Sequence, residues 1–383
     1  MTTANGRVTK DGSPRVLLFS EKNIYEHAVW RCSFHEFERI IQEIDSVDVI
    51  SPKPKSWYTH GKRAALRSGK YFSTPLSTGV EKVKLEREYD LFFTVCEKPS
   101  ELLNLRSVDW KGHCKTSVCW LPEFYAYEID EHKSCMEVLS QFDYVIYMFV
   151  VIDPFQKILG GKGTYLPAGV DCLLFCPYPD PPARSIDVLS IGRRSEITHQ
   201  ELLRMMREDG MFYVYDTIDS LRAYNLDEHR LLAANRAKRS RYFLVNPGKV
   251  NKPEETGGQS EFGYRYFEAA APGTIMIGQR PTNNREFDRI FHWEDAVIDM
   301  PFDSDNIRSI IRELDKEPER QHKIRRTNMV QSLLYHDWAY RWESVLKIAG
   351  MEALPALSHR KQRLKDLAAQ VEESCEPVSV AWR

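Results

Sequence analysis

Residues 260–278 read SEFGYRYFEAAAPGTIMIG and carry the clearest succession of structural signals in the chain. The first residues are polar and turn-forming, and a short helix carrying Glu268 follows them. Pro272-Gly273 then breaks the helix, and the apolar run Thr274–Ile277 has the length and composition of a buried strand. The stretch therefore predicts a helix that feeds directly into a strand, as in an α/β sheet.

The same alternation of strands and helices extends over the whole chain. Short apolar runs predict strands at 15–19, 48–50, 89–95, 116–121, 144–151, 164–166, 186–191, 212–215, 242–245, 274–277 and 296–299. Segments with helical spacing lie between and after them, at 33–44, 131–139, 198–207, 227–237, 307–314, 319–334 and 336–348. Continuous apolar strands that alternate with helices indicate parallel sheets covered on both faces, so we predict an α/β fold.

The length of 383 residues favours two domains over one core. Prolines cluster between Pro167 and Arg184, and proline stiffens a connector and cannot join a central strand. We expect a flexible leader over 1–14, an N-terminal domain over 15–170 and a Pro-rich linker over 171–185. A C-terminal domain over 186–336, a closing helix over 337–349 that returns towards the N-terminal domain, and a charged tail over 350–383 would follow.

Composition and charge narrow the classes of protein. A net charge of −2 disfavours a dedicated nucleic-acid binder, which usually carries a clear basic excess. The N-terminus is polar, and the longest apolar run is far shorter than the ~20 residues of a membrane helix. The eight cysteines lack metal-site spacing. We therefore expect a cytoplasmic protein with reduced thiols, no metal site, no cofactor and at most peripheral membrane contact.

The residues around Glu268 suggest a ligand. A carboxylate can accept hydrogen bonds from two hydroxyls, as a ribose diol requires, and glycine lets a ligand approach the backbone closely. Glu268 lies about one helical turn before Gly273, which opens the strand. This arrangement predicts a nucleotide site, with a nucleotide-sugar as its first candidate.

Four segments resemble, in order, the donor half of GT-B glycosyltransferases of the large, mostly retaining superfamily with a Glu-Ala-x-x-x-Gly-Thr donor motif. They are Tyr165–Asp171 with Phe175 and Pro177 after it, Ser190–Arg193, Glu268–Thr274 and His336–Trp338. The resemblance covers about residues 164–348, and the first half matches only in its alternation of strands and helices. It implies two Rossmann-like domains facing across a cleft and sugar transfer from a nucleotide-diphosphate donor to a saccharide, lipid or small-molecule acceptor.

The resemblance also implies roles for individual residues. Glu268 would bind the ribose, and Gly192 and Arg193 would lie at the diphosphate. Gly273 and Thr274 would approach the phosphates through backbone N–H groups, although Gly273 also suits a helix C-cap.

This sequence departs from the family at two positions. The family's lysine five residues after the phosphate-binding arginine is Thr198 here, so Arg194, Lys249 or Arg265 would supply the second positive charge. The family's glutamate eight residues before the ribose carboxylate is Ser260, which leaves Glu261 as a candidate catalytic residue near the transferred sugar.

The mechanism implied by the resemblance is retaining and metal-independent, because the leaving phosphate itself can take the acceptor proton. An inverting enzyme would need a general base in the first half, with His27 as the candidate. Glu21, Glu26 and Arg31 are further candidate acceptor contacts in the loop after the first strand. A nucleotide-sugar epimerase or hydrolase and a non-catalytic nucleotide-sugar-binding protein remain open as other readings of the same fold.

Overall fold

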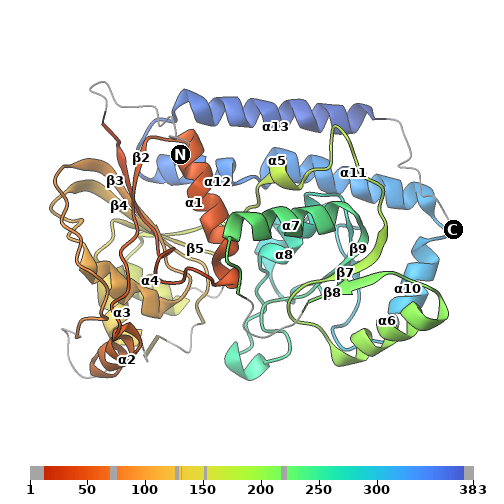
Figure 1. Ribbon diagram of the computed structural model, residues 1–383, viewed down its shortest axis with the longest axis horizontal. Coiled ribbons are helices and arrows are strands. Elements are labelled where there is room, and N and C mark those ends of the chain that lie inside the picture. The colour runs from red at the N-terminus through yellow and green to blue at the C-terminus, as the bar shows by residue number, and fades with distance from the viewer. Residues whose placement is uncertain are drawn as a thin grey trace. The chain divides into compact units, whose positions relative to one another are not determined.

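The computed structural model describes residues 13–69, 76–125, 129–130, 132–150, 153–216 and 222–374. The chain divides into two compact units, each built around a parallel sheet (Figure 1). Unit 1 comprises residues 1–167 and 341–360, and unit 2 comprises residues 168–340 and 361–383. The predicted α/β fold is confirmed, while most of the predicted leader lies outside the described residues.

Unit 1 contains a six-stranded parallel sheet in the order β2-β1-β3-β4-β5-β6. Its strands are β1 (Val16–Phe19), β2 (Val47–Ile50), β3 (Tyr89–Val95), β4 (Cys114–Leu121), β5 (Tyr144–Tyr147) and β6 (Gly163–Tyr165). The connecting helices are η1 (Val29–Arg31), α1 (Cys32–Ile44), α2 (Tyr58–Ser68), η2 (Pro99–Ser107), α3 (Lys133–Leu139) and α4 (Asp153–Leu159). β1 and β3, which lie inside the sheet, are apolar and buried over almost their whole length because both faces of the sheet are covered.

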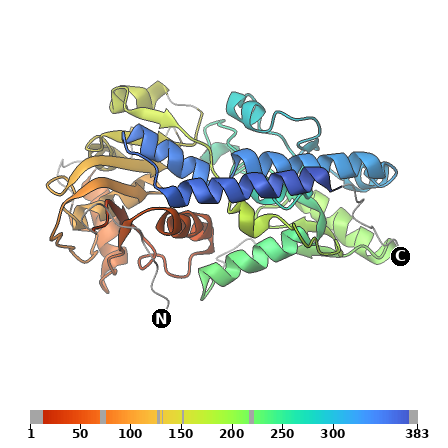
Figure 2. The ribbon, with the colours of Figure 1, turned by 90° about the horizontal axis from the view of Figure 1, so that it is seen from above.

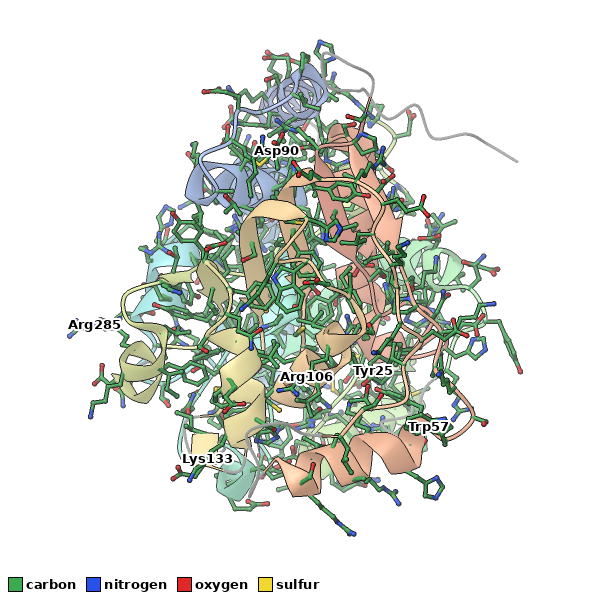
Figure 3. The ribbon with its side chains drawn as sticks, turned by 90° about the vertical axis from the view of Figure 1, so that its left-hand side faces the viewer. Tyr25, Trp57, Asp90, Arg106, Lys133 and Arg285 are labelled. Carbon is green, nitrogen blue, oxygen red and sulfur yellow. The ribbon has the colours of Figure 1, made fainter. Side chains whose placement is uncertain are left out.

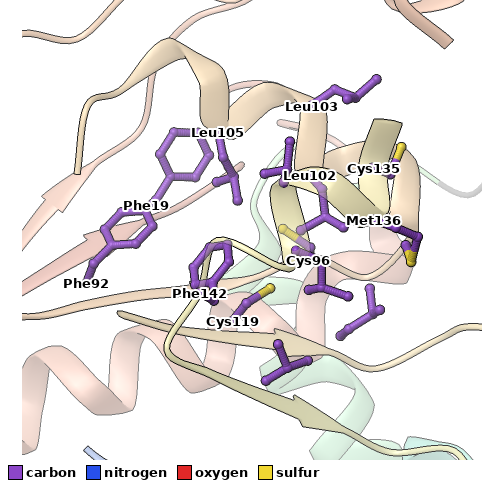
Figure 4. Packing of buried hydrophobic residues seen from close by; sticks show 14 of the residues in the cluster. Phe19, Phe92, Cys96, Leu102, Leu103, Leu105, Cys119, Cys135, Met136 and Phe142 are labelled. Carbon is purple, nitrogen blue, oxygen red and sulfur yellow. The ribbon is translucent and has the colours of Figure 1, made fainter. Parts of the chain in front are cut away.

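The strand order explains which helices cover which face of the unit 1 sheet. The chain moves one way from β1 to β2 and the other way from β3 to β6, and right-handed crossovers then place the helices on opposite faces. Figure 2 shows α1 and α4 on opposite sides of these strands. The face with η2, α3 and α4 holds one large apolar cluster, part of which Figure 4 shows around Phe92, Leu102 and Phe142.

Aromatic side chains fill the other face of this sheet. Phe37 of α1 packs edge-on against Phe93 of β3 and Trp120 of β4, with ring centroids 5.9 and 5.2 Å apart. Trp342 packs against Phe93 at 5.3 Å. Trp342 belongs to α12 (Trp338–Ile348), so a helix from the far end of the chain completes the core of unit 1.

Unit 2 contains a five-stranded parallel sheet in the order β11-β10-β9-β7-β8. Its strands are β7 (Ile186–Ser190), β8 (Tyr213–Tyr215), β9 (Ser240–Val245), β10 (Ile275–Gly278) and β11 (Ile298–Asp299). Its helices are α5 (Cys172–Phe175), α6 (Glu196–Glu208), α7 (Leu226–Lys238), η4 (Pro253–Glu255), α8 (Tyr264–Ala270), α9 (Arg285–Ile290), α10 (Ile307–Leu314) and α11 (Pro318–Tyr335). α6 and α10 pack on one face, while α7 and α8 contact each other on the opposite face.

The order of the unit 2 strands creates a topological switch point between β7 and β9. The connections from these two neighbours leave in opposite directions, and such a point opens a crevice outside the carboxyl ends of the strands. The residues after Ser190 and Val245 therefore lie where α/β folds bind ligands.

One predicted boundary is wrong. The strand expected over 144–151 ends at Tyr147, because its neighbours pair with it only as far as Leu121 and Tyr165. Met148 and Phe149, which follow Tyr147, are buried without joining the sheet. The charged tail contains an ordered helix, α13 (Pro355–Glu373), whose Leu357, Leu364 and Val371 are buried at seven-residue intervals. The charges on its other faces dominate the composition.

Candidate functional site

Gly192 and Arg193 lie directly after β7, at the switch point of the unit 2 sheet. Gly192 has a φ of +87°, a conformation that L side chains rarely adopt. Its N–H donates to Oδ1 of Asp216, 2.8 Å away, and Asp216 follows the neighbouring strand β8. The turn is thus fixed by glycine and by a carboxylate, and it leaves the side chain of Arg193 exposed to solvent.

Glu268 lies on α8 and is buried between two arginines. Arg230 of α7 donates through Nη1 to Oε1 of Glu268, and Arg265, one turn earlier on α8, donates through Nη1 to Oε2. α7 and α8 lie side by side on the same face of the sheet (Figure 1), which brings Arg230 to the carboxylate. Glu268 is the residue predicted to bind the ribose, and both of its carboxylate oxygens are therefore bound by cations in this structure.

The electrostatics keep Glu268 ionised. Burial by itself would raise the pKa of its carboxyl, but the charges of Arg265 and Arg230 outweigh that effect and lower the pKa to about 2. Arg230 is 4% exposed and stacks over the ring of Phe175 at 4.8 Å, so it forms the inner wall of the site. The side chain of Arg265 is 36% exposed and forms the outer wall.

The outer wall also contacts the glycine turn. A Cβ placed on Gly192 would lie 3.8 Å from Nε and 3.9 Å from Nη2 of Arg265. The structure therefore brings Gly192, Arg265 and Glu268 together, three residues that the sequence assigned to one donor site. Gly192 follows the end of β7, whereas Arg265 and Glu268 both lie on α8.

Lys249 lies in the loop after β9, at the same switch point, and has a φ of 51°. Its Nζ is 3.8 Å from Oε2 of Glu255. A hydrogen bond from Lys252 lowers the pKa of Glu255, and the charges of Lys249 and Arg193 act in the same direction. Arg193 and Lys249 thus lie close enough to act electrostatically on the same carboxylate.

Gly273 and Thr274 lie at the amino end of β10. The N–H of Gly273 donates to the carbonyl of Ala270 at 2.8 Å, and the N–H of Thr274 donates to that of Ala269 at 3.2 Å. With a φ of +69°, Gly273 provides the left-handed residue that ends α8. Both N–H groups are used in this helix end, and a contact of these residues with a donor stays a prediction.

Glu261 is half-buried in the loop before α8. Its carboxylate accepts from Nε2 of Gln259 at 3.3 Å and from Nδ2 of Asn284 at 3.4 Å. Its own carbonyl accepts from the N–H of Gly248 at 2.7 Å, which ties this loop to the one that carries Lys249. Glu261 thus lies in the loops at the carboxyl edge, and its catalytic role stays a prediction.

Thr198 is buried inside unit 2. Its hydroxyl donates to the carbonyl of Ser304 at 2.7 Å, and its N–H donates to Oγ of Ser195, the N-cap of α6. Arg194 donates to the carbonyl of Asp216 and stacks on the ring of Tyr215 at 5.0 Å. Of the alternatives considered for the second cation, Arg265 is the one placed against the glycine turn.

The candidate residues of unit 1 fall into two groups. His27 is half-buried in the loop between β1 and η1. Glu21 and Arg31 are fully buried and paired at 3.1 Å, and Arg31 also binds Glu101 at 2.7 Å. The prediction that Glu21 and Arg31 contact an acceptor directly is therefore wrong, because both side chains are buried inside the fold.

The buried pair supports an aromatic surface on the same unit. Asn104 donates to Oε1 of Glu21 at 2.7 Å and to Oη of Tyr58 at 3.3 Å. The hydroxyls of Tyr58 and Tyr25 are 3.2 Å apart. Figure 3 shows Tyr25 near Trp57, a residue that is 44% exposed at the start of α2.

Sequence reasoning missed Arg230, although a signal for it existed. The buried residues of α7 are Leu226, Arg230, Ala234 and Ala237, which follow helical spacing. An arginine in line with two alanines on the inner face of a helix indicates a buried cation that needs a carboxylate partner.

Neither a metal cluster nor a membrane span occurs in the part of the chain that the structure describes. Among those residues, no group of three or more His, Cys, Asp or Glu side chains is arranged to hold a metal ion. Within the same ranges, none of the helices combines the length and the apolar character needed to cross a bilayer.

Comparisons with known proteins agree with this architecture. A family model described as glycosyl transferase-like matches residues 216–347. The structure is similar to an alpha-glucosyltransferase solved with UDP and a 13-mer DNA containing a central A:G mismatch, with a TM-score of 0.52, 12% identity and coverage of 88% of this chain and 100% of that one. The structure is also similar to an alpha-glucosyltransferase solved with UDP and a 13-mer DNA containing a HMU base. Here the TM-score is 0.51 and the identity 11%, and the match covers 88% of this chain and 99% of that one. No curated protein matches the chain significantly.

The two parallel sheets and these structural matches define the fold as that of a GT-B glycosyltransferase, with two Rossmann-like domains. The predicted resemblance to this class is confirmed, and the C-terminal part of the chain carries a glycosyl transferase-like sequence signature.

Proposed function

We propose that this protein is a glycosyltransferase that takes a sugar from a nucleotide-diphosphate donor bound by unit 2. The observation that carries the proposal is the buried carboxylate of Glu268, which Arg265 links to the Gly192 turn at the switch point of the sheet. A low-pKa carboxylate can accept from a ribose diol, and the glycine turn allows a diphosphate to approach the backbone.

The surrounding cations suit the chemistry of sugar transfer. As the sugar leaves, negative charge grows on the diphosphate, and fixed cations nearby stabilise that charge in the transition state. Arg193, Lys249 and Arg265 are three cations at the carboxyl edge of the unit 2 sheet. The proposed reaction is retaining and metal-independent, with the leaving phosphate taking the acceptor proton and Glu261 next to the transferred sugar.

Unit 1 would bind the acceptor. The loop that carries His27 follows β1, and the exposed Trp57 follows β2, so both lie at the carboxyl edge of the unit 1 sheet. The apolar face of an aromatic ring suits stacking on a sugar. The acceptor proposed is a saccharide, a lipid or a small molecule. Because the solved neighbours contain DNA, a 13-mer duplex belongs among the acceptors tested.

The first experiment is a thermal-shift screen of UDP, GDP, ADP and dTDP and of their sugars. A ligand that binds only the folded state raises the midpoint of unfolding. We expect one nucleotide series to shift the unchanged protein and to shift Arg193→Ala and Glu268→Gln much less. Gln is chosen because Ala at 268 would leave the buried Arg230 without its partner. Arg289→Ala, an exposed arginine paired only locally on α9, is the matched control.

The second experiment follows the donor that binds. Sugar transfer to an added acceptor supports the proposal, with the anomeric configuration of the product reporting retention or inversion. Donor turnover without any acceptor would instead indicate an epimerase or hydrolase. Binding without turnover would indicate a nucleotide-sugar-binding protein, and no shift with any nucleotide would overturn the donor site.

A further inference from the structure

The carboxylate of Glu268 cannot meet a ribose as it stands. Its side chain is 3% exposed, with Oε1 held by Arg230 and Oε2 held by Arg265. Arg230 is itself buried, whereas about a third of the Arg265 side chain reaches solvent. Of these two partners, Arg265 is the one that covers the carboxylate on its solvent side.

We propose that Arg265 is an exchangeable partner of Glu268, displaced by the ribose and then taken up by the diphosphate. This inference rests on the proposed function. The ribose hydroxyls would bring no new charge, and they would donate to Oε2 in place of the guanidinium. Arg265, already beside Gly192, would then need only a side-chain rotation to reach phosphate oxygens at the glycine turn.

The charges at the site make this exchange favourable. One carboxylate faces two guanidinium groups, so Arg230 alone neutralises Glu268 and the charge of Arg265 is in excess. Burial makes the Arg230 pair costly to separate, because separating it would leave a charge without a partner inside unit 2. The partly exposed Arg265 pair gains less from its contact and is the weaker of the two.

The exchange makes the two halves of the donor depend on each other. A nucleoside alone would displace Arg265 without giving it a new partner, and would bind weakly. A nucleoside diphosphate would supply the phosphate that the displaced guanidinium binds. Arg265 would thus favour nucleoside diphosphates over nucleosides, and it would replace the lysine for which Thr198 stands in this chain.

The test measures affinities of the unchanged protein and of Arg265→Ala by calorimetry. The ligands are whichever of UDP, GDP, ADP and dTDP binds most tightly, and the nucleoside of the same base. We expect Arg265→Ala to lower the affinity for the diphosphate about 10- to 100-fold, because charge-assisted hydrogen bonds to the phosphate are lost. The same variant should bind the nucleoside about two- to fivefold more tightly, because a competing partner of Glu268 has gone.

Two further variants separate the exchange from simpler roles. Arg193→Ala should weaken binding of the diphosphate and leave the affinity for the nucleoside unchanged. Arg193 is exposed at the turn, and a ribose at Glu268 would not have to displace it. Arg265→Lys keeps the charge and should recover part of the diphosphate affinity. Circular dichroism confirms that each variant is folded.

The outcomes distinguish a failure of the proposed exchange from a failure of the donor site itself. If Arg265→Ala weakens both ligands alike or leaves the nucleoside affinity unchanged, the exchange is wrong and the donor site stands. If Arg265→Ala leaves the diphosphate affinity unchanged, Arg265 does not bind phosphate. If the unchanged protein binds none of the nucleotides, the proposed function is wrong and the exchange with it.

Discussion

Arg31 and Glu101 form an ion pair in the interior of unit 1, with 2.7 Å between Nη1 and Oε2 and both side chains essentially inaccessible to solvent. Arg31 also binds Glu21 and the carbonyl of Val95, which lie at the ends of β1 and β3. Burial and the nearby Glu101 raise the pKa of Glu21. A single guanidinium thus links the carboxyl ends of the neighbouring strands β1 and β3 to η2.

Replacing Arg31 by Met should destabilise unit 1 by about 3–5 kcal/mol, because carboxylates would be left buried without their cation. Urea unfolding, followed by circular dichroism, measures the change. Arg39→Ala on α1 breaks the exposed pair with Glu43 and should change stability by less than about 0.5 kcal/mol. Equal effects of the two substitutions would contradict the role given to Arg31.

The stability of unit 2 should depend on the ionisation of Glu268. The pKa of this carboxyl is about 2 in the folded protein against 4.5 for an ordinary glutamate. Its contribution of about 3 kcal/mol is therefore complete above pH 4.5 and is lost as the pH falls towards 2. The stability gap between the unchanged protein and Glu268→Gln should narrow by about 1 kcal/mol between about pH 7 and about pH 3.5. A gap that stays constant over this range would show that the carboxylate gains nothing from its arginines.

Gly278 should tolerate no side chain. It ends β10 opposite Val245 with a φ of +151°, and a Cβ there would lie 1.8 Å from the carbonyl oxygen of Val245. Gly278→Ala should cost more than about 3 kcal/mol, since backbone atoms cannot move aside within a paired strand. Gly210→Ala is the control: its φ is +66° and no atom lies within 4 Å, so it should cost about 1 kcal/mol. Thermal unfolding of the two variants measures the difference.

Trp342 should stabilise unit 1 through its indole N–H as well as its ring. Nε1 donates to Oδ2 of Asp45 at 2.8 Å, and both groups are buried. Trp342→Phe keeps a packed ring but removes this donor, and should cost about 1–2 kcal/mol in urea unfolding. The exposed Trp57→Phe should be nearly neutral by the same measurement. No loss in Trp342→Phe would mean that the hydrogen bond does not contribute.

The sequence pattern predicts the strands well because each is a continuous apolar run bounded by turn residues. It cannot predict the order in which the strands pair, which depends on the direction of each crossover. The switch point between β7 and β9 is therefore a finding of the structure.

At the candidate site, the sequence pointed to Gly192, Arg265 and Glu268 but not to their arrangement. Arg230 is 38 residues from Glu268 in the chain, and their pairing depends on α7 and α8 lying side by side. Glu268 is predicted to bind a ligand, but its two carboxylate oxygens accept hydrogen bonds from Arg230 and Arg265. Local patterns carry no information about contacts of this kind.

Unit 1 is assembled from two pieces of chain that are synthesised far apart in time. Its first 167 residues emerge from the ribosome well before Arg341–Arg360, which bring Trp342 to Phe37 and Phe93. Until then the aromatic face of the nascent sheet lacks Trp342. A chain that stopped at the first boundary between the units would lack Trp342, so unit 1 can be studied alone only if residues 341–360 are supplied with residues 1–167.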